Sequence, residues 1–312
     1  MEIFTFILFN NIAPIFIIIY LGYLLTSKFD LDIFTLSKLN FYIFVPALVF
    51  VKVYETEIKL EFLTAILFGL IILALLSLLG WIIARIMDHE VSMSTALTNS
   101  IMFYNSGNFG LPLVMLVFAN TAYASYAVSV QIMILVVQNL TTNTIGFFNA
   151  GRGQMHYLDS IKKILKMPAV YGITLAILIK LVNIEIDHLF FWPSIEHLQN
   201  GLISVALLTL GTQLYHTNFT FKNKDVYIAS LTRLIGGPIL AYLLLTIMGI
   251  DGVMAQVLFI SSSVPSAVNT ALIAVEFNNE PDFASQVVMT STLLSAITLT
   301  IVIYLSQYLF AI

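Results

Sequence analysis

Apolar runs long enough to cross a lipid bilayer follow one another along almost the whole chain. The hydrocarbon core of a bilayer is about 30 Å thick, so a helix needs about 20 mainly apolar residues to cross it. Runs of this kind, bounded by charged or turn residues, lie at 5–25, 34–54, 62–86, 93–118, 122–148, 161–182, 194–215, 225–248, 252–276 and 283–310. The sequence therefore predicts an all-α membrane protein with ten transmembrane helices.

The composition excludes several other classes of protein. Of 312 residues, 59% are hydrophobic and 10% are charged, whereas soluble domains carry about 25% charged residues. The absence of cysteine rules out disulfides, thiolate metal sites and cysteine nucleophiles. No HExxH motif and no basic tract is present, so neither an enzyme nor a nucleic-acid-binding protein is indicated, and we expect no cofactor. The N-terminal run lacks a basic leader and a cleavage site, so we expect it to be retained as the first span.

Lysine and arginine residues are distributed unevenly between the two predicted sides of the membrane. One side holds Lys28, Lys38, Arg85, Arg152, Lys162, Lys163, Lys166, Lys222 and Lys224, and the other holds Lys52, Lys59 and Lys180. Because basic loops resist translocation, we expect the first set to lie in the cytoplasm. An even number of spans then places both termini outside the cell membrane.

The two halves of the chain resemble each other weakly. The stretch "NIAPIFIIIYLGYLL" in the first run pairs with "KMPAVYGITLAILIK" in the sixth, and the fourth run pairs with the ninth. Five spans in each half is an odd number, so the second half enters the membrane upside down. This is the inverted-repeat plan of many secondary transporters, and we expect the repeats to cover 1–150 and 151–312.

Two of the runs carry clusters of polar and helix-breaking residues. The clusters consist of Asn105, Ser106, Gly107, Asn108 and Pro112 in the fourth run, and of Ser262, Pro265, Ser266 and Asn269 in the ninth. Irregular backbone survives within a bilayer only where protein or a watery cavity satisfies it. We predict two broken helices that cross near the midplane and bind a small polar or anionic solute at their half-helix N-termini. The alternative is a pair of proline kinks used for helix packing.

Three further polar residues lie within apolar runs. Gln131 and Gln138 share one face of the fifth helix, since seven residues make about two turns. They either line the solute path or form hydrogen bonds between helices. Arg233 either balances a substrate carboxylate, reaches the cytoplasmic surface, or caps the carbonyl ends of a broken helix. No acid lies in the middle of a run, which argues against a cationic substrate; the coupling ion, sodium or proton, stays open.

Several stretches resemble the auxin efflux carrier family, the PIN-like membrane transport proteins. They include "APIFIIIYLGYLL", "NSGNFGLPL", "LTRLIGGPIL" and "SSSVPSAVNTALIA". The resemblance implies a fold similar to that of bile acid–sodium symporters, with a scaffold at 1–60 and 160–216 and a mobile core at 61–148 and 224–312. It also implies a homodimer joined through the scaffold. The crossover asparagines and prolines of the family match Asn105, Asn108, Pro112, Pro265 and Asn269.

The resemblance also implies a substrate class. Bacterial relatives are associated with dicarboxylates such as malate and malonate. Plant auxin exporters often carry a long cytoplasmic loop between the fifth and sixth spans, which is short here, so kinase-regulated auxin transport is not carried over. We therefore expect a secondary transporter of a small organic anion, a mono- or dicarboxylate or an auxin-like acid, that works by an elevator-type motion of the core. The alternative is a non-transporting receptor or sensor that uses the same pocket.

Overall fold

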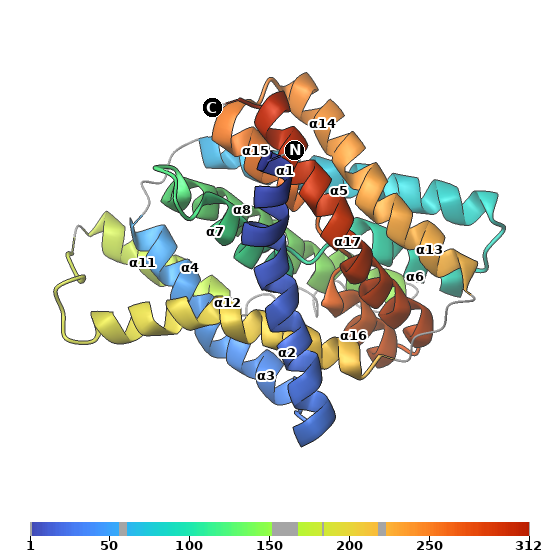
Figure 1. Cartoon of the computed structure of the whole chain (residues 1–312), viewed down its shortest axis with the longest axis horizontal. Coiled ribbons are helices and arrows are strands. Elements are labelled where there is room, and N and C mark those ends of the chain that lie inside the picture. The colour runs from blue at the N-terminus through green and yellow to red at the C-terminus, as the bar shows by residue number, and fades with distance from the viewer. Residues whose placement is uncertain (1, 56–60, 152–167, 183, 218–222, 312) are drawn as a thin grey trace.

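The regular structure of the protein is helical throughout the residues that are described. The computed structural model describes residues 2–55, 61–151, 168–182, 184–217 and 223–311, and every regular element within them is a helix (Figure 1). The start of the predicted sixth span lies outside these ranges, and so do Lys59, Arg152, Lys162, Lys163, Lys166 and Lys222. Both termini lie at the same end of the molecule in Figure 1.

The first half of the chain contains five interrupted or continuous helical segments, and single π-helical turns (η) connect several of the helices. The elements are α1 (Glu2–Ile7), η1 (Leu8–Ile12), α2 (Ala13–Phe29), α3 (Ile33–Leu39), η2 (Asn40–Phe44), α4 (Val45–Glu55), α5 (Glu61–Ile86), α6 (Val91–Met102), η3 (Ser106–Gly110), α7 (Leu111–Phe118), α8 (Ala124–Thr141), η4 (Thr142–Gly146) and α9 (Phe147–Ala150).

The second half follows the same pattern of long helices and one interruption. Its described elements are α11 (Pro168–Leu181), α12 (Trp192–Tyr215), α13 (Lys224–Leu231), η5 (Thr232–Gly236), α14 (Gly237–Met248), α15 (Gly252–Ser261), α16 (Val268–Glu276) and α17 (Pro281–Leu309).

Six continuous helices within the described residues are long and apolar enough to cross a membrane. They are Thr5–Phe29, Ile33–Glu55, Glu61–Ile86, Ala124–Ala150, Lys224–Met248 and Pro281–Leu309. The other four predicted spans correspond to α11, to α12, and to two pairs of shorter helices, α6 with η3–α7 and α15 with α16. Large apolar side chains such as Phe6, Leu63 and Ile297 are more than half exposed on the outside of these helices. Such a surface suits lipid rather than water.

The helices α2 and α12 approach each other at two glycines. A Cβ atom on Gly22 would lie 2.9 Å from the carbonyl carbon of Leu208, and one on Gly211 would lie 2.7 Å from the amide nitrogen of Tyr23. These neighbours are backbone atoms, which cannot rotate away. Small residues at such a crossing let membrane helices pack closely. The same helix pair is joined by a buried hydrogen bond of 2.9 Å between the hydroxyls of Thr26 and Thr212.

The start of α3 is fixed by an exposed aspartate. The Asp32 carboxylate accepts hydrogen bonds from the Thr35 hydroxyl at 2.6 Å and from the amides of Phe34 at 3.2 Å and Thr35 at 3.1 Å. An N-cap of this kind satisfies amides that have no partner in the first helical turn. Because the Thr35 hydroxyl and the Phe34 amide favour the charged form, they hold the pKa of this carboxyl below its usual value of 3.8.

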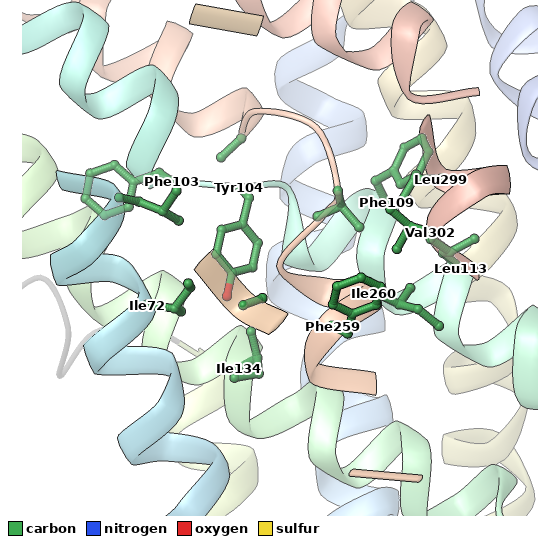
Figure 2. Close-up of a cluster of buried hydrophobic side chains, with 14 of the residues drawn as sticks. Ile72, Phe103, Tyr104, Phe109, Leu113, Ile134, Phe259, Ile260, Leu299 and Val302 are labelled. Atoms are coloured by element: carbon green, nitrogen blue, oxygen red, sulfur yellow. The ribbon is translucent and has the colours of Figure 1, made fainter. Parts of the chain in front are cut away.

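The main hydrophobic core surrounds the irregular segment that follows α6. Figure 2 shows Phe103, Tyr104 and Phe109 of this region among apolar side chains from α5, α7, α8, α15 and α17. The surrounding residues labelled there are Ile72, Leu113, Ile134, Phe259, Ile260, Leu299 and Val302. Non-helical backbone is therefore buried in protein and kept away from lipid, as the physics of the bilayer requires.

Candidate functional site

The helix that begins with α6 is interrupted at the residues predicted from the sequence. α6 ends at Met102, and helical structure resumes at Ser106. The side chain of Asn105 caps the new start, since its Oδ1 atom accepts a hydrogen bond from the amide of Asn108 at 3.1 Å. Pro112 lies at the beginning of α7, directly after the π-helical turn η3. The predicted polar cluster thus ends one helix and starts another.

The second predicted interruption separates α15 from α16. α15 ends at Ser261, α16 begins at Val268, and the segment between them is not helical. Pro265 has no amide hydrogen to offer to a helix. The side chain of Ser266 is buried and donates from its Oγ to the carbonyl of Ser100 at 2.7 Å, which fastens this segment to the end of α6.

The two interruptions lie against each other as a short antiparallel pair. Tyr104 and Ser266 form an isolated β-bridge. The amide of Asn105 donates to the carbonyl of Pro265 at 2.8 Å, and the amide of Ala267 donates to the carbonyl of Phe103 at 3.0 Å. An unpaired backbone group in hydrocarbon costs several kcal/mol. Each interruption therefore provides hydrogen-bond partners for backbone groups of the other. Two separate proline kinks would not do so.

Two glutamines from α8 complete the pairing of the first interruption. Gln131 is fully buried, and its Nε2 donates to the carbonyl of Ser106 at 2.9 Å. The Oε1 atom of Gln138 accepts a hydrogen bond from the amide of Tyr104 at 3.3 Å. Both side chains thus serve as hydrogen-bond partners of irregular backbone, one of the two roles that the sequence left open.

A small cavity lies beside the paired interruptions. Its lining comes from the first interruption, from α8 and η4, from the start of α16, and from η2 and α4 on the opposite side: Phe41, Val45, Tyr104, Asn105, Ser106, Gly107, Asn108, Leu135, Gln138, Asn139, Thr142, Ala267, Val268 and Asn269. Its volume is about 30 Å³, which is room for about one or two water molecules. None of these described lining residues carries a formal charge.

One of the amide side chains at this cavity offers a free hydrogen-bond donor. The Oδ1 atom of Asn105 is held by the amide of Asn108, and the Oε1 atom of Gln138 is held by the amide of Tyr104. Because a backbone amide can bond only to the oxygen of each side chain, the orientation of both is fixed. The NH₂ group of Gln138 interacts with the Tyr104 hydroxyl, and the buried NH₂ group of Asn105 has no hydrogen-bond partner among the described residues. Asn105 therefore offers a donor, which suits a solute rich in acceptors.

Comparison with known proteins identifies the family of the chain. Residues 7–163 and 154–303 match the family described as membrane transport protein. The chain belongs to the membrane transport protein family. An uncharacterized transporter from Methanothermobacter thermautotrophicus is 22% identical over 303 residues, which cover 93% of this chain and 95% of that protein. The match confirms the family resemblance stated from the sequence.

Arg233 of this membrane transport protein lies behind the cavity and does not line it. Its side chain is fully buried, and its Nη1 donates to the carbonyl of Ile101 at 3.1 Å. Its Nη2 donates to the carbonyl of Ser262. Both carbonyls belong to the ends of interrupted helices. The sequence leaves three roles open for Arg233, and these contacts correspond to one of them, capping of the carbonyl ends of broken helices.

The structure of the membrane transport protein brings half of the predicted site residues together at the cavity. They are Asn105, Ser106, Gly107, Asn108, Gln138 and Asn269. The others lie in the interruptions or contact them without lining the cavity: Pro112, Gln131, Arg233, Ser262, Pro265 and Ser266.

Phe41 and Val45 line the cavity from a different helix and were not predicted. An aromatic and an aliphatic residue in an apolar run carry no signal that separates them from lipid-facing neighbours. No group of three His, Cys, Asp or Glu that could hold a metal ion occurs among the described residues.

Proposed function

We propose that this protein is a secondary transporter of a small organic anion, and that the cavity beside the paired interruptions is its binding site. The observation that carries the proposal is the amide donor of Asn105, a residue that lines the cavity and whose oxygen is occupied by a backbone amide. A carboxylate presents several acceptor lone pairs and no donor. A mono- or dicarboxylate such as malonate or malate, or an auxin-like acid, therefore matches the donor at this site.

The electrostatic surroundings of the cavity favour an anion over a cation. Among the residues that the structure describes, no Asp or Glu lines it. Two helical segments, η3–α7 and α16, begin at its edge, and α16 has no side-chain cap at its first residue. The N-terminus of a helix carries about half a positive charge. Discontinuous membrane helices with their N-termini directed at an anionic substrate are a recurring arrangement in secondary transporters.

The position and the size of the cavity support an elevator-type mechanism. It is lined both by the paired interruptions, which belong to the proposed core, and by Phe41 and Val45 of η2 and α4, which belong to the proposed scaffold. A volume of about 30 Å³ is too small for a dicarboxylate, so these two walls have to separate before the solute can enter. We propose that a core of 61–148 and 224–312 moves against a scaffold of 1–60 and 160–216.

The same proposal includes the wider architecture. Ten spans would form a 5+5 inverted repeat of 1–150 and 151–312, with both termini outside the cell membrane. Two copies would pair through their scaffolds. The positions of α6 with α7 and of α15 with α16 support the repeat, since both pairs are interrupted and meet each other.

Uptake into proteoliposomes tests the transport function. We expect labelled malonate or malate to accumulate or exchange under at least one gradient of voltage, proton or sodium. Asn108→Ala and Asn269→Ala should abolish uptake and leave expression intact, whereas Asn10→Ala, which changes an exposed asparagine on η1, should transport normally. No movement of any carboxylate under any gradient would rule out this transport class. Ligand binding without flux would identify the protein as a receptor or sensor.

A further inference from the structure

Two carbonyl groups at the crossing have lost the amide that would pair with them in a continuous helix. In an α-helix the carbonyl of residue i accepts from the amide of residue i+4. The amide of Asn105, the helical partner of Ile101, donates to Pro265, and the amide of Ser266, the helical partner of Ser262, donates to the hydroxyl of Ser291. The carbonyls of Ile101 and Ser262 therefore need another donor.

The guanidinium of Arg233 supplies both of these donors. Nη1 binds the carbonyl of Ile101 at 3.1 Å, and Nη2 binds the carbonyl of Ser262. The guanidinium also lies over the ring of Tyr104, 4.8 Å from its centroid. One side chain thus contacts the end of α6, the end of α15 and Tyr104, one of the three residues between α6 and η3.

The π-helical turn η5 and Gly237 leave space for this side chain. Arg233 lies in the π-helical turn η5, a kind of turn that is frequent at functional sites. At Gly237 a Cβ atom would collide with the guanidinium and with the carbonyl of Ser262, lying 2.9 Å from Cζ of Arg233. The glycine therefore allows η5 to approach the ends of the two interrupted helices.

The charge of Arg233 is balanced by helix ends and not by an acid. Within the described part of the chain, no carboxylate is placed beside the guanidinium. The C-terminus of a helix carries about half a negative charge. α6 and α15 both end at this side chain, so together they provide about one negative charge. Unwound carbonyls and half-helix C-termini are also the groups that bind a co-transported sodium ion in transporters with discontinuous helices.

We propose that Arg233 is a resident cation that occupies the position where a coupling cation would otherwise bind. It is a positioning residue: it holds the two interruptions together so that Asn105 and the start of α16 face the cavity. The inference rests on the transport function proposed above. Its consequence is that solute movement through the unchanged protein needs no sodium ion at the crossing, and that removal of the guanidinium creates a site for an added cation.

Thermal unfolding of the purified full chain tests this assignment independently of transport. The unchanged protein, Arg233→Ala, Arg233→Lys and the exposed control Arg85→Gln are heated in sodium chloride, in N-methyl-D-glucamine chloride and with added methylguanidinium, at constant ionic strength. We expect the unchanged protein and Arg85→Gln to unfold at the same temperature in all three media. Arg233→Ala should unfold at a lower temperature that rises with sodium or methylguanidinium until it saturates, and Arg233→Lys should lie between the two.

Two results would overturn the assignment. One is saturable stabilisation of the unchanged protein by sodium, which remains measurable even where Arg233→Ala does not fold. The other is an Arg233→Ala or Arg233→Lys protein that unfolds like the unchanged one in every medium. Uptake of malonate with sodium replaced by N-methyl-D-glucamine adds a transport readout, in which full uptake supports the proposal and loss of uptake contradicts it. Absence of uptake in both media would count against the transport function, while the unfolding data would still decide the role of Arg233.

Discussion

Replacing Asn105 by aspartate separates the two tasks that this side chain performs. Its Oδ1 atom caps η3 by accepting from the amide of Asn108 at 3.1 Å, and its Nδ2 group is the free donor at the cavity. Aspartate keeps an oxygen for the cap and removes the donor. Alanine removes both. The pair of variants therefore distinguishes a loss of solute binding from a loss of structure.

The magnitudes follow from the contacts that each variant loses. A hydrogen bond to a charged group contributes about 1.5–3 kcal/mol, and 1.4 kcal/mol corresponds to about tenfold in affinity. Asn105→Asp should therefore raise the apparent Kd for malonate by about 10- to 100-fold, and repulsion between like charges makes this a lower bound. Its unfolding temperature without ligand should fall, because an unpaired carboxylate replaces a side chain that is 5% exposed, although the cap is kept. Asn105→Ala should lose a comparable amount of affinity and, in addition, about 1 kcal/mol of stability with its cap.

The assay combines ligand-induced thermal stabilisation with initial rates of uptake into proteoliposomes. A ligand that binds only the native state raises its apparent stability in proportion to RT ln(1 + [L]/Kd), so titration with malonate gives the change in Kd directly. Measurements at pH 8 keep the introduced carboxyl ionised. Wild-type affinity and uptake in Asn105→Asp would show that the free amide does not contact the solute, and the argument for an anion would fail.

Three further outcomes are expected. Gly211→Ala should destabilise the protein by about 1–3 kcal/mol through overpacking against backbone, whereas Gly69→Ala, whose new Cβ meets only side-chain atoms of Ile134 and Val137, should be destabilised less. Gln131→Leu removes one of the two donors to the buried carbonyl of Ser106, which also accepts from the amide of Leu111, so it should lower stability by about 0.5–1.5 kcal/mol and leave the KM for malonate unchanged. Asp32→Ala should destabilise the protein at neutral pH. Because the folded pKa of this carboxyl is lowered, its contribution to stability is present above pH 3.8 and disappears as the pH falls through the folded pKa. The difference in unfolding temperature between the variant and the unchanged protein should therefore vanish under strongly acidic conditions.

The interruptions could be predicted because their causes are local. Pro112 and Pro265 remove backbone donors, and the asparagine and serine side chains beside them offer replacements within a few residues. The run at 93–118 therefore separates into α6 and η3–α7 where the polar cluster begins. Apolar runs fix the remaining helices for the same reason, since the length and hydropathy of a span are properties of consecutive residues.

The partners of the site could not be predicted, because they come from distant parts of the chain. Nothing around Ser291 shows that its hydroxyl accepts from the amide of Ser266. The π-helical turns were also absent from the prediction: η2 inserts one extra residue per turn at Asn40 without altering the apolar pattern of its run. The sequence leaves three roles open for Arg233, because it indicates the depth of this residue in the membrane but does not indicate its two carbonyl partners.

The hydrogen bonds between the interruptions join segments that are synthesised at different times. The amide of Asn105 pairs with the carbonyl of Pro265, which is translated about 160 residues later. At about 5–20 residues per second, the ribosome needs roughly 10–30 s to add that stretch. Throughout this interval the first interruption has left the ribosome and its backbone partner does not yet exist. The nascent chain therefore has to shelter these groups in the insertion machinery or in water until its second half arrives.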